Sequence, residues 1–318
     1  MRNPVFDVMK GIGILLVILG HMSGNINPVM HNFIFSFHMP LFFIIAGYFF
    51  KPKEIKKSIE KDFNRLIHPY LFTCALMIIY HLIHYTWNHD LNPFLNSLIA
   101  TFWGNGSTNH SSIIFADIPS TGAIWFLLAL FWCKNIYNII SNSRYRYCLA
   151  IIISLFATVI DRYFINLPFT LLPGMSALVF FAAGNLAKQI DISKMWLVIG
   201  IPVWFYCIFY SKMSIVRCYY ENYPLDIIGG IVGTYITYIM AKVICTHNIT
   251  KELFSWLGKN SLAILCYHLL VMVIPFIGFI NKICGINSSI SYFALSFILP
   301  LVFAYVSSYI PFTKKIFG

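Results

Sequence analysis

One predicted helix near the N-terminus carries three side chains that can do ionic and acid–base chemistry. Lys10 and His21 are eleven positions apart, which leaves them about 20° from the same helix face and roughly 16 Å apart along the axis. Asp7 lies on the same side, one turn before Lys10. A lysine can hold an anion, and an imidazole transfers protons near neutral pH. The pattern predicts a cation at one end of the helix and a proton-transfer group toward the other.

A second histidine, His38, stands two residues before Pro40 in the next apolar stretch. Proline removes a helical hydrogen bond, so a kink is expected beside His38. Because the two stretches run antiparallel, His38 can approach His21, and two imidazoles suit proton transfer. Two structural explanations stay open. Asp7 and Lys10 can be an interfacial ion pair with His21 directed outward, and His38 can bond to a neighbouring helix.

The elements that carry these residues are predicted membrane helices. The chain of 318 residues is 59% hydrophobic and 10% charged, whereas a soluble domain is about 25% charged. The apolar runs are too long and too continuous for a membrane β-barrel. Residues 1–318 are therefore expected to form one all-α domain, a polytopic bundle of about ten transmembrane helices. The predicted spans are 5–24, 30–50, 66–86, 123–141, 148–164, 170–187, 195–211, 226–245, 260–280 and 289–311.

Lysine and arginine predict the orientation of the bundle. If 51–65 faces the cytoplasm, both termini do so as well, and the only Lys and Arg residues outside are Arg162, Lys212, Arg217 and Lys282. Loop 87–122 has neither residue type. Its 91–103 part is expected to form a short surface helix, and 104–112 a flexible polar loop. The net charge of +11 thus belongs to cytoplasmic loops and does not indicate a nucleic-acid partner.

The eight cysteines are scattered and form no CxxC pair. Most lie in apolar stretches, where cysteine acts as a small hydrophobic residue. The sequence therefore predicts neither a disulfide nor a metal site. No small-residue cleavage site follows the first apolar run, so no removable signal peptide is expected.

Several short motifs follow one another in an order that resembles acyltransferase family 3, a family of bacterial membrane O-acyltransferases. They include the Lys10–His21 pattern and the Phe-His-Met-Pro-Leu-Phe-Phe run around His38. Each motif is weak alone, but the ordered set spans nearly the whole chain. The motifs lie at residues 7–21, 37–48, 65–70, 124–127 and 257–268.

The resemblance implies transfer of an acyl group, commonly acetyl, from cytosolic acyl-CoA to a hydroxyl of a cell-surface or polyprenyl-linked glycan. It implies a multi-pass protein of the bacterial inner membrane in contact with lipid, in a minimal form without a soluble domain. Acyl-CoA is then a substrate, and no permanent cofactor is expected. Lys10 and Arg65 match basic positions of the family, and Lys61 is the nearest partner of Arg65. These three side chains are the expected donor-binding residues, since phosphates favour Lys and Arg.

In the mechanism that fits this pattern, the pantetheine arm threads from the basic residues toward His21. His21 acts as general base on the acceptor hydroxyl or carries the acyl group as a nucleophile. His38 orients His21 or shares the proton. The absence of a Gly-x-Ser-x-Gly elbow argues against an acyl-serine route.

Four further residues are assigned weaker roles. Ser261 and His268 are seven positions apart on one helix face, and either line the channel or bond within the core. Trp125 either stacks on a sugar or anchors the membrane interface. Glu221, in a loop with three tyrosines, either binds sugar hydroxyls or is simply solvated.

Three other functions stay open at this point. A transporter or flippase for a lipid-linked glycan also places His and Lys in the membrane, although no inverted repeat is visible. A structural subunit of a polysaccharide export complex does not need the Lys–His stripe. The third alternative is an unrelated kind of multi-span acyltransferase, but the motifs around His21 and His38 argue against it.

Overall fold

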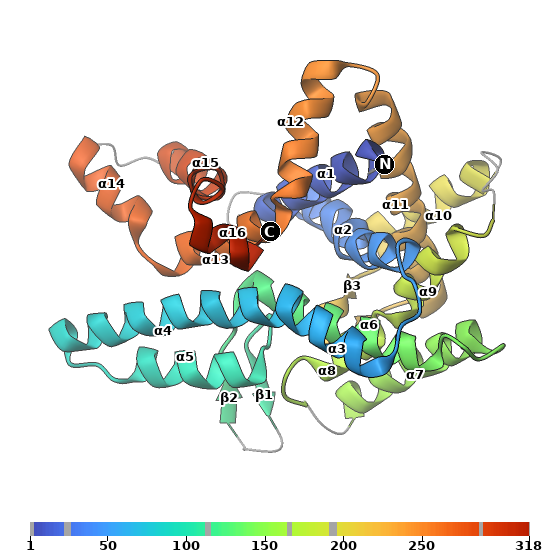
Figure 1. The fold of residues 1–318 in the computed structure, drawn as a ribbon, viewed down its shortest axis with the longest axis horizontal. Helices are drawn as coiled ribbons and strands as arrows, with labels where there is room; N and C mark the ends of the chain where they lie inside the picture. The colour runs from blue at the N-terminus through green and yellow to red at the C-terminus, as the bar shows by residue number, and fades with distance from the viewer. Residues whose placement is uncertain are drawn as a thin grey trace.

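The structure is a computed structural model, and it describes residues 3–21, 27–111, 116–163, 167–190, 196–285 and 289–317. Nearly all of this chain is helical, as the apolar composition predicts (Figure 1). The helices are α1 Pro4–His21, α2 Pro28–Tyr48, α3 Ile55–Asp62, α4 His68–Asn88, α5 Asn92–Trp103, α6 Trp125–Ile140, α7 Arg146–Tyr163, α8 Leu171–Ser176, α9 Leu178–Ala187, α10 Trp196–Tyr210, α11 Tyr223–Ile244, α12 Asn248–Lys259, α13 Ser261–Val273, α14 Phe276–Cys284, α15 Ser289–Ser307 and α16 Pro311–Phe317.

Short elements join some of these helices. A π-helical turn, η2 (Phe63–Ile67), connects α3 to α4, and a 3₁₀ turn, η3 (Gly122–Ile124), precedes α6. Two small antiparallel hairpins pair β1 (Asn109–Ser111) with β2 (Ala116–Ile118) and β3 (Met213–Ser214) with β4 (Tyr219–Tyr220), the second enclosing the 3₁₀ turn η4 (Ile215–Arg217). The helix predicted over 91–103 is confirmed as α5; its position on the membrane surface stays a prediction. The stretch 104–112, expected to be a flexible loop, instead contributes β1.

Six helical segments of the described residues are long and apolar enough to cross a membrane. A seventh is possible if α12 and α13, which meet at an angle of 68°, together form one broken span. The protein is therefore an all-α multi-pass membrane protein. The six segments are Pro4–His21, Pro28–Tyr48, Ile55–Asn88, Gly122–Ile140, Tyr223–Ile244 and Ile290–Ser307.

Other predicted spans are shorter or interrupted in the structure. The 170–187 stretch is divided at Ala177 into α8 and α9, and α10 has 15 residues. The 260–280 stretch ends as a helix at Val273, because Pro275 lacks an amide proton and holds Ile274 in an extended conformation. The charged residues 248–259, interpreted from the sequence as a cytoplasmic loop, form α12.

Two pairs of glycines let helices pack backbone to backbone. A Cβ on Gly47 of α2 would lie 1.9 Å from the Phe181 carbonyl oxygen, and one on Gly184 of α9 would lie 2.0 Å from that of Ile44. Gly11 and Gly258 form the same reciprocal arrangement between α1 and α12, which lie side by side in Figure 1. Small residues at helix interfaces are a standard means of close packing in membranes. These contacts fix α1 and α2, the two helices that carry the predicted histidines.

Candidate active site

One large cavity of about 1970 Å³ runs between the helices. Its walls come from α1, α2, η2, α6 and α7, together with the β3–β4 hairpin. Residues of the predicted cytoplasmic stretches and residues of the predicted outer loops line the same space. Seven of the predicted site residues line it, namely Lys10, His21, His38, Lys61, Arg65, Trp125 and Ser261.

Helix α1 presents one continuous stripe to this cavity. Lys10, Ile14, Val17 and His21 all line it, and their spacing of four, three and four residues keeps them on one helical face. Asp7 is 3% exposed and does not line the cavity; its carboxylate oxygen lies 4.0 Å from Lys10 Nζ. The structure thus places the cation and the imidazole on one wall, with two aliphatic side chains between them.

His21 and His38, two of the histidines that line the cavity, are held in the same way by their own helices. His21 Nδ1 lies 2.8 Å from the Val17 carbonyl oxygen, and His38 Nδ1 lies 2.8 Å from that of Ile34. A carbonyl oxygen can only accept a hydrogen bond, so Nδ1 carries the proton in each ring. In the neutral ring Nε2 then carries the lone pair, which is the atom that a general base or a nucleophile needs.

An aromatic shell surrounds the two histidines. The Phe35 ring centroid lies 4.7 Å from that of His38 and 6.4 Å from that of His21. On the other side, the His268 ring lies 5.6 Å from the His21 ring at an interplanar angle of 70°. His268 itself does not line the cavity. Helix α2 continues through Pro40 to Tyr48, so the proline does not end the helix.

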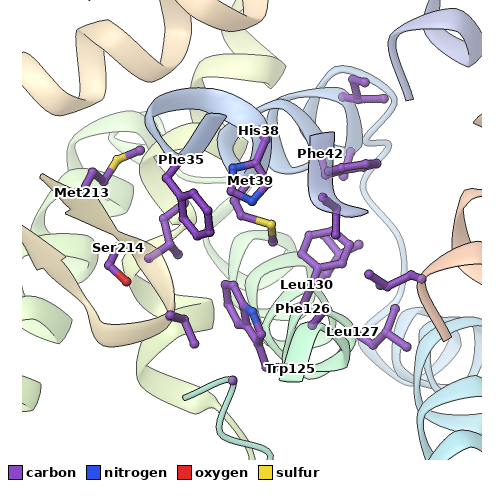
Figure 2. A pocket seen from close by; sticks show the side chains of 18 of the residues that line it. Phe35, His38, Met39, Phe42, Trp125, Phe126, Leu127, Leu130, Met213 and Ser214 are labelled. Carbon is purple, nitrogen blue, oxygen red and sulfur yellow. The ribbon is translucent and has the colours of Figure 1, made fainter. Parts of the chain in front are cut away.

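Helix α6 supplies the opposite wall of the pocket near His38. Figure 2 shows α2 side chains facing α6 side chains across this space, namely Phe35, His38, Met39 and Phe42 opposite Trp125, Phe126, Leu127 and Leu130. Trp125 is only 5% exposed, and the chain at Gly106 packs so closely on it that a Cβ there would lie 2.2 Å from the indole. Trp125 is therefore a wall of the pocket with little free surface for a sugar.

At its other end the cavity is strongly basic. We call this set of residues the basic rim; it comprises Lys10, Lys51, Lys53, Lys61, Arg65, Lys134 and Lys259. The sequence analysis selected three of them. The other four come from three separate stretches, and their only signal in the sequence was the clustering of Lys and Arg in loops predicted to share one side.

Side-chain contacts hold the basic rim in place. Asn138 of α6 binds the backbone of Lys53 twice, accepting from its N–H at 3.0 Å and donating to its C=O at 2.9 Å. Lys134 forms an ion pair with Asp62, a 3%-exposed acid that also lines the cavity. The π-helical turn η2 carries Arg65, and π-turns inside helices are frequent at functional sites.

The pKa of Lys61 reports how close these cations are. Lys61 lies in the charged stretch 51–65, ahead of the predicted membrane span 66–86. The neighbouring side chain of Lys53 and the charge of Arg65 lower the pKa of Lys61 to about 8. An array of cations that repel one another in this way is suited to bind a polyanion.

The remaining predicted residues lie outside this arrangement. Glu221 is exposed and follows β4; its backbone N–H donates to the Lys212 carbonyl oxygen at 3.2 Å, and its side chain does not line the cavity. Arg162, Lys212 and Arg217, three of the four cations predicted outside, do line it. Among the residues that the structure describes, no group of three His, Cys, Asp or Glu side chains could hold a metal ion.

The family described as "Acyltransferase domain" matches residues 3–309. The chain belongs to this acyltransferase family. The match covers almost the entire chain, including every residue of the cavity stripe, the two histidines and the basic rim. The protein is therefore an acyltransferase enzyme, and membership of this family favours catalysis over the transport function that the sequence left open.

Two curated relatives share part of this acyltransferase. "Nodulation protein NolL" from Sinorhizobium fredii (strain NBRC 101917 / NGR234) is 33% identical over 122 residues, 32% of each chain. The protein of the same name from Mesorhizobium japonicum (strain LMG 29417 / CECT 9101 / MAFF 303099) is 36% identical over 90 residues, 24% of each chain. The matches thus span about a third or less of the length of these relatives. No solved structure matches the acyltransferase.

Proposed function

We propose that this enzyme is an O-acyltransferase that moves an acyl group, acetyl first among them, from cytosolic acyl-CoA to a hydroxyl of a cell-surface or lipid-linked glycan. One observation supports this proposal most strongly. The basic rim and His21 line the same cavity, so a donor held by its phosphates at the rim has a route to the imidazole. The proposal includes one domain over 1–318, ten membrane spans, both termini in the cytoplasm, and the bacterial inner membrane.

The donor half of the site follows from charge. The phosphate groups of CoA bind Lys10, Lys61 and Arg65, and the other cations of the rim add to their field. Between Lys10 and His21 the α1 wall consists of Ile14 and Val17, which suits the thin pantetheine arm and its acyl end. The thioester then lies next to His21 and His38.

The chemical step uses the lone pair on His21 Nε2. This nitrogen takes the proton of the acceptor hydroxyl, and the oxygen attacks the thioester carbonyl. The C–S bond breaks, the new C–O bond remains, and the CoA thiolate takes the proton back from Nε2. In the two-step version, Nε2 itself attacks the thioester, the C–S bond breaks and CoA leaves as the thiolate. The acceptor hydroxyl then attacks the acyl carbon, the C–N bond to His21 breaks, and the hydroxyl proton passes through His38 to the thiolate. His38 shares the proton or holds the thioester in position.

The acceptor reaches the histidines from the opposite end of the cavity. Trp125 forms a wall beside them, and the β3–β4 hairpin brings Arg217 to the opening. Glu221 follows that hairpin and binds sugar hydroxyls at the entrance. The glycan acceptor is supported by the family resemblance and by the partial similarity to nodulation proteins.

Acyl transfer by the purified protein tests this function. The full chain in lipid nanodiscs is mixed with acetyl-CoA and an extract of cell-surface glycans, and both free CoA thiol and the acyl mass increment on the glycan are measured. We expect the wild type and His247→Ala to be active, because His247 is exposed and outside the cavity. We expect His21→Ala to lose about 100-fold or more of the rate.

Mass spectrometry of surface glycans from cells is the second test of this function. The acyl increment is expected in cells with the wild type and absent both without the chain and with His21→Ala. Full activity of a folded His21→Ala variant would exclude His21 as the catalytic base. Loss of surface polymer with unchanged acylation would overturn the proposed function itself.

A further inference from the structure

His268 of α13 is a buried imidazole without a hydrogen bond. It is 1% exposed, and neither of its ring nitrogens has a hydrogen-bond partner among the described residues. By contrast, His21 and His38 each donate from Nδ1 to a backbone carbonyl oxygen. Leaving a buried polar group unpaired destabilises the folded state, so His268 lowers the stability of the fold.

The His21 ring lies beside His268. The two ring centroids are 5.6 Å apart and the ring planes meet at 70°, an edge-to-face arrangement. The residues beside His268 on α13 are apolar and buried, including Leu265 and Leu269.

A purely structural histidine does not fit these observations. Packing alone would be served better by an aromatic or aliphatic side chain, which fills the space without an unpaired nitrogen. A core hydrogen bond, the alternative considered from the sequence, is not present among the described residues. What remains is a partner that the imidazole meets only during the reaction.

We propose that His268 is a positioning residue for His21, an inference that rests on the proposed function. When His21 Nε2 takes the proton from the acceptor hydroxyl, the ring becomes an imidazolium beside a neutral imidazole with an unused lone pair. His268 accepts a hydrogen bond from that N–H and holds the ring until the CoA thiolate leaves and takes the proton. No proton is gained or lost at His268, which acts through His21 and does not touch the substrate.

The test compares three substitutions in the nanodisc protein. His268→Phe removes both nitrogens and keeps a ring, His268→Gln keeps a polar acceptor, and His81→Phe is the matched control. His81 is another histidine with a buried, unpartnered ring nitrogen, but it lies on α4 and outside the cavity. We expect kcat of His268→Phe to fall about tenfold or more, within the range of positioned acid–base groups, with KM for acetyl-CoA unchanged. His268→Gln should recover part of kcat.

Stability separates this role from a folding defect. His268→Phe should unfold at the same or a higher temperature than the wild type, because it removes an unpaired buried group. An unchanged kcat in His268→Phe would overturn the proposal, as would an equal loss of kcat in His81→Phe. If the wild type itself transfers no acyl group, the proposed function fails; if it is active and His268→Phe is equally active, only this inference fails.

Discussion

Among single residues, Lys61 is expected to make donor binding depend on pH. Its pKa is lowered to about 8, so it carries its charge at pH 7 and loses it as the pH rises through about 8. The phosphates of CoA stay ionised over that range, since their second pKa is about 6. We therefore expect KM for acetyl-CoA to rise between pH 7 and 9 as the rim loses one positive charge.

The matched variant is Lys61→Arg, because arginine stays protonated at every pH in this range. It should bind the donor at pH 7 about as well as the wild type and show a flatter KM profile up to pH 9. A wild-type profile that is already flat, or one that Lys61→Arg leaves unchanged, would contradict the role of Lys61.

Lys134 and Asp62 make a second residue-scale prediction. Asp62 is 3% exposed and is paired with Lys134. Removing one partner of a buried ion pair costs about 3–5 kcal/mol, because the other charge stays buried alone. Lys134→Ala should therefore lower the unfolding temperature in detergent, and adding Asp62→Asn should restore much of it. The double variant leaves the net charge of the cavity unchanged, because it removes one cation and one anion. It should still bind acetyl-CoA more weakly, because the donor phosphates lose their contact with Lys134; full recovery of binding would remove Lys134 from the donor site.

Much of the site could be read from residue types and spacing, and part could not. Lys10 and His21 share a cavity wall because helical periodicity is fixed. The neighbour of His21 could not be predicted, because the contact with His268 depends on how α13 packs on α1. The extra cations of the basic rim were missed for the same reason: Lys53, Lys134 and Lys259 come from separate stretches that only the fold brings together.

At the scale of helices, the α2–α9 contact predicts a sharp difference between two glycines. A Cβ on Gly184 would lie 2.0 Å from the Ile44 carbonyl oxygen, whereas one on Gly278 of α14 meets nothing within 4 Å. Gly184→Ala should separate α2 from α9, lower the unfolding temperature and reduce activity, because α2 carries His38. Gly278→Ala should keep activity and raise helix stability by about 0.5–1 kcal/mol. Equal unfolding temperatures for the two variants would contradict the close packing.

The same scale shows where hydropathy is informative. The long apolar runs 5–24 and 30–50 became α1 and α2, because a continuous run of that length has few alternatives in a membrane. Helix α12 was missed because Lys251, Glu252 and Lys259 made an amphipathic helix look like a loop. The bend between α12 and α13 at Asn260 leaves no trace in hydropathy, because the apolar content of a stretch does not report the direction of its backbone.

For the whole molecule, the orientation can be tested with two native cysteines. Cys148 and Cys284 are both exposed, and the charge pattern puts Cys148 on the cytoplasmic side and Cys284 outside. A membrane-impermeant maleimide added to intact spheroplasts should label the wild type and Cys148→Ala, but not Cys284→Ala. After permeabilisation, Cys284→Ala should be labelled as well. Labelling of Cys284→Ala in intact spheroplasts would reverse or invalidate the predicted topology.

The cavity is lined both by predicted cytoplasmic stretches and by predicted outer loops. Such a cavity raises the question whether ions leak through it across the membrane. The basic rim includes Lys10, Lys53 and Lys61, which line this space. It is expected to repel sodium ions and protons, as positive charges do in pores that exclude cations. The charges proposed to retain CoA would thus also guard the electrochemical gradient of the membrane. By excluding cations, an enzyme with the proposed acyl passage can keep the membrane impermeable to them. Neutralising the rim is expected to let cations leak across the membrane and to reduce activity.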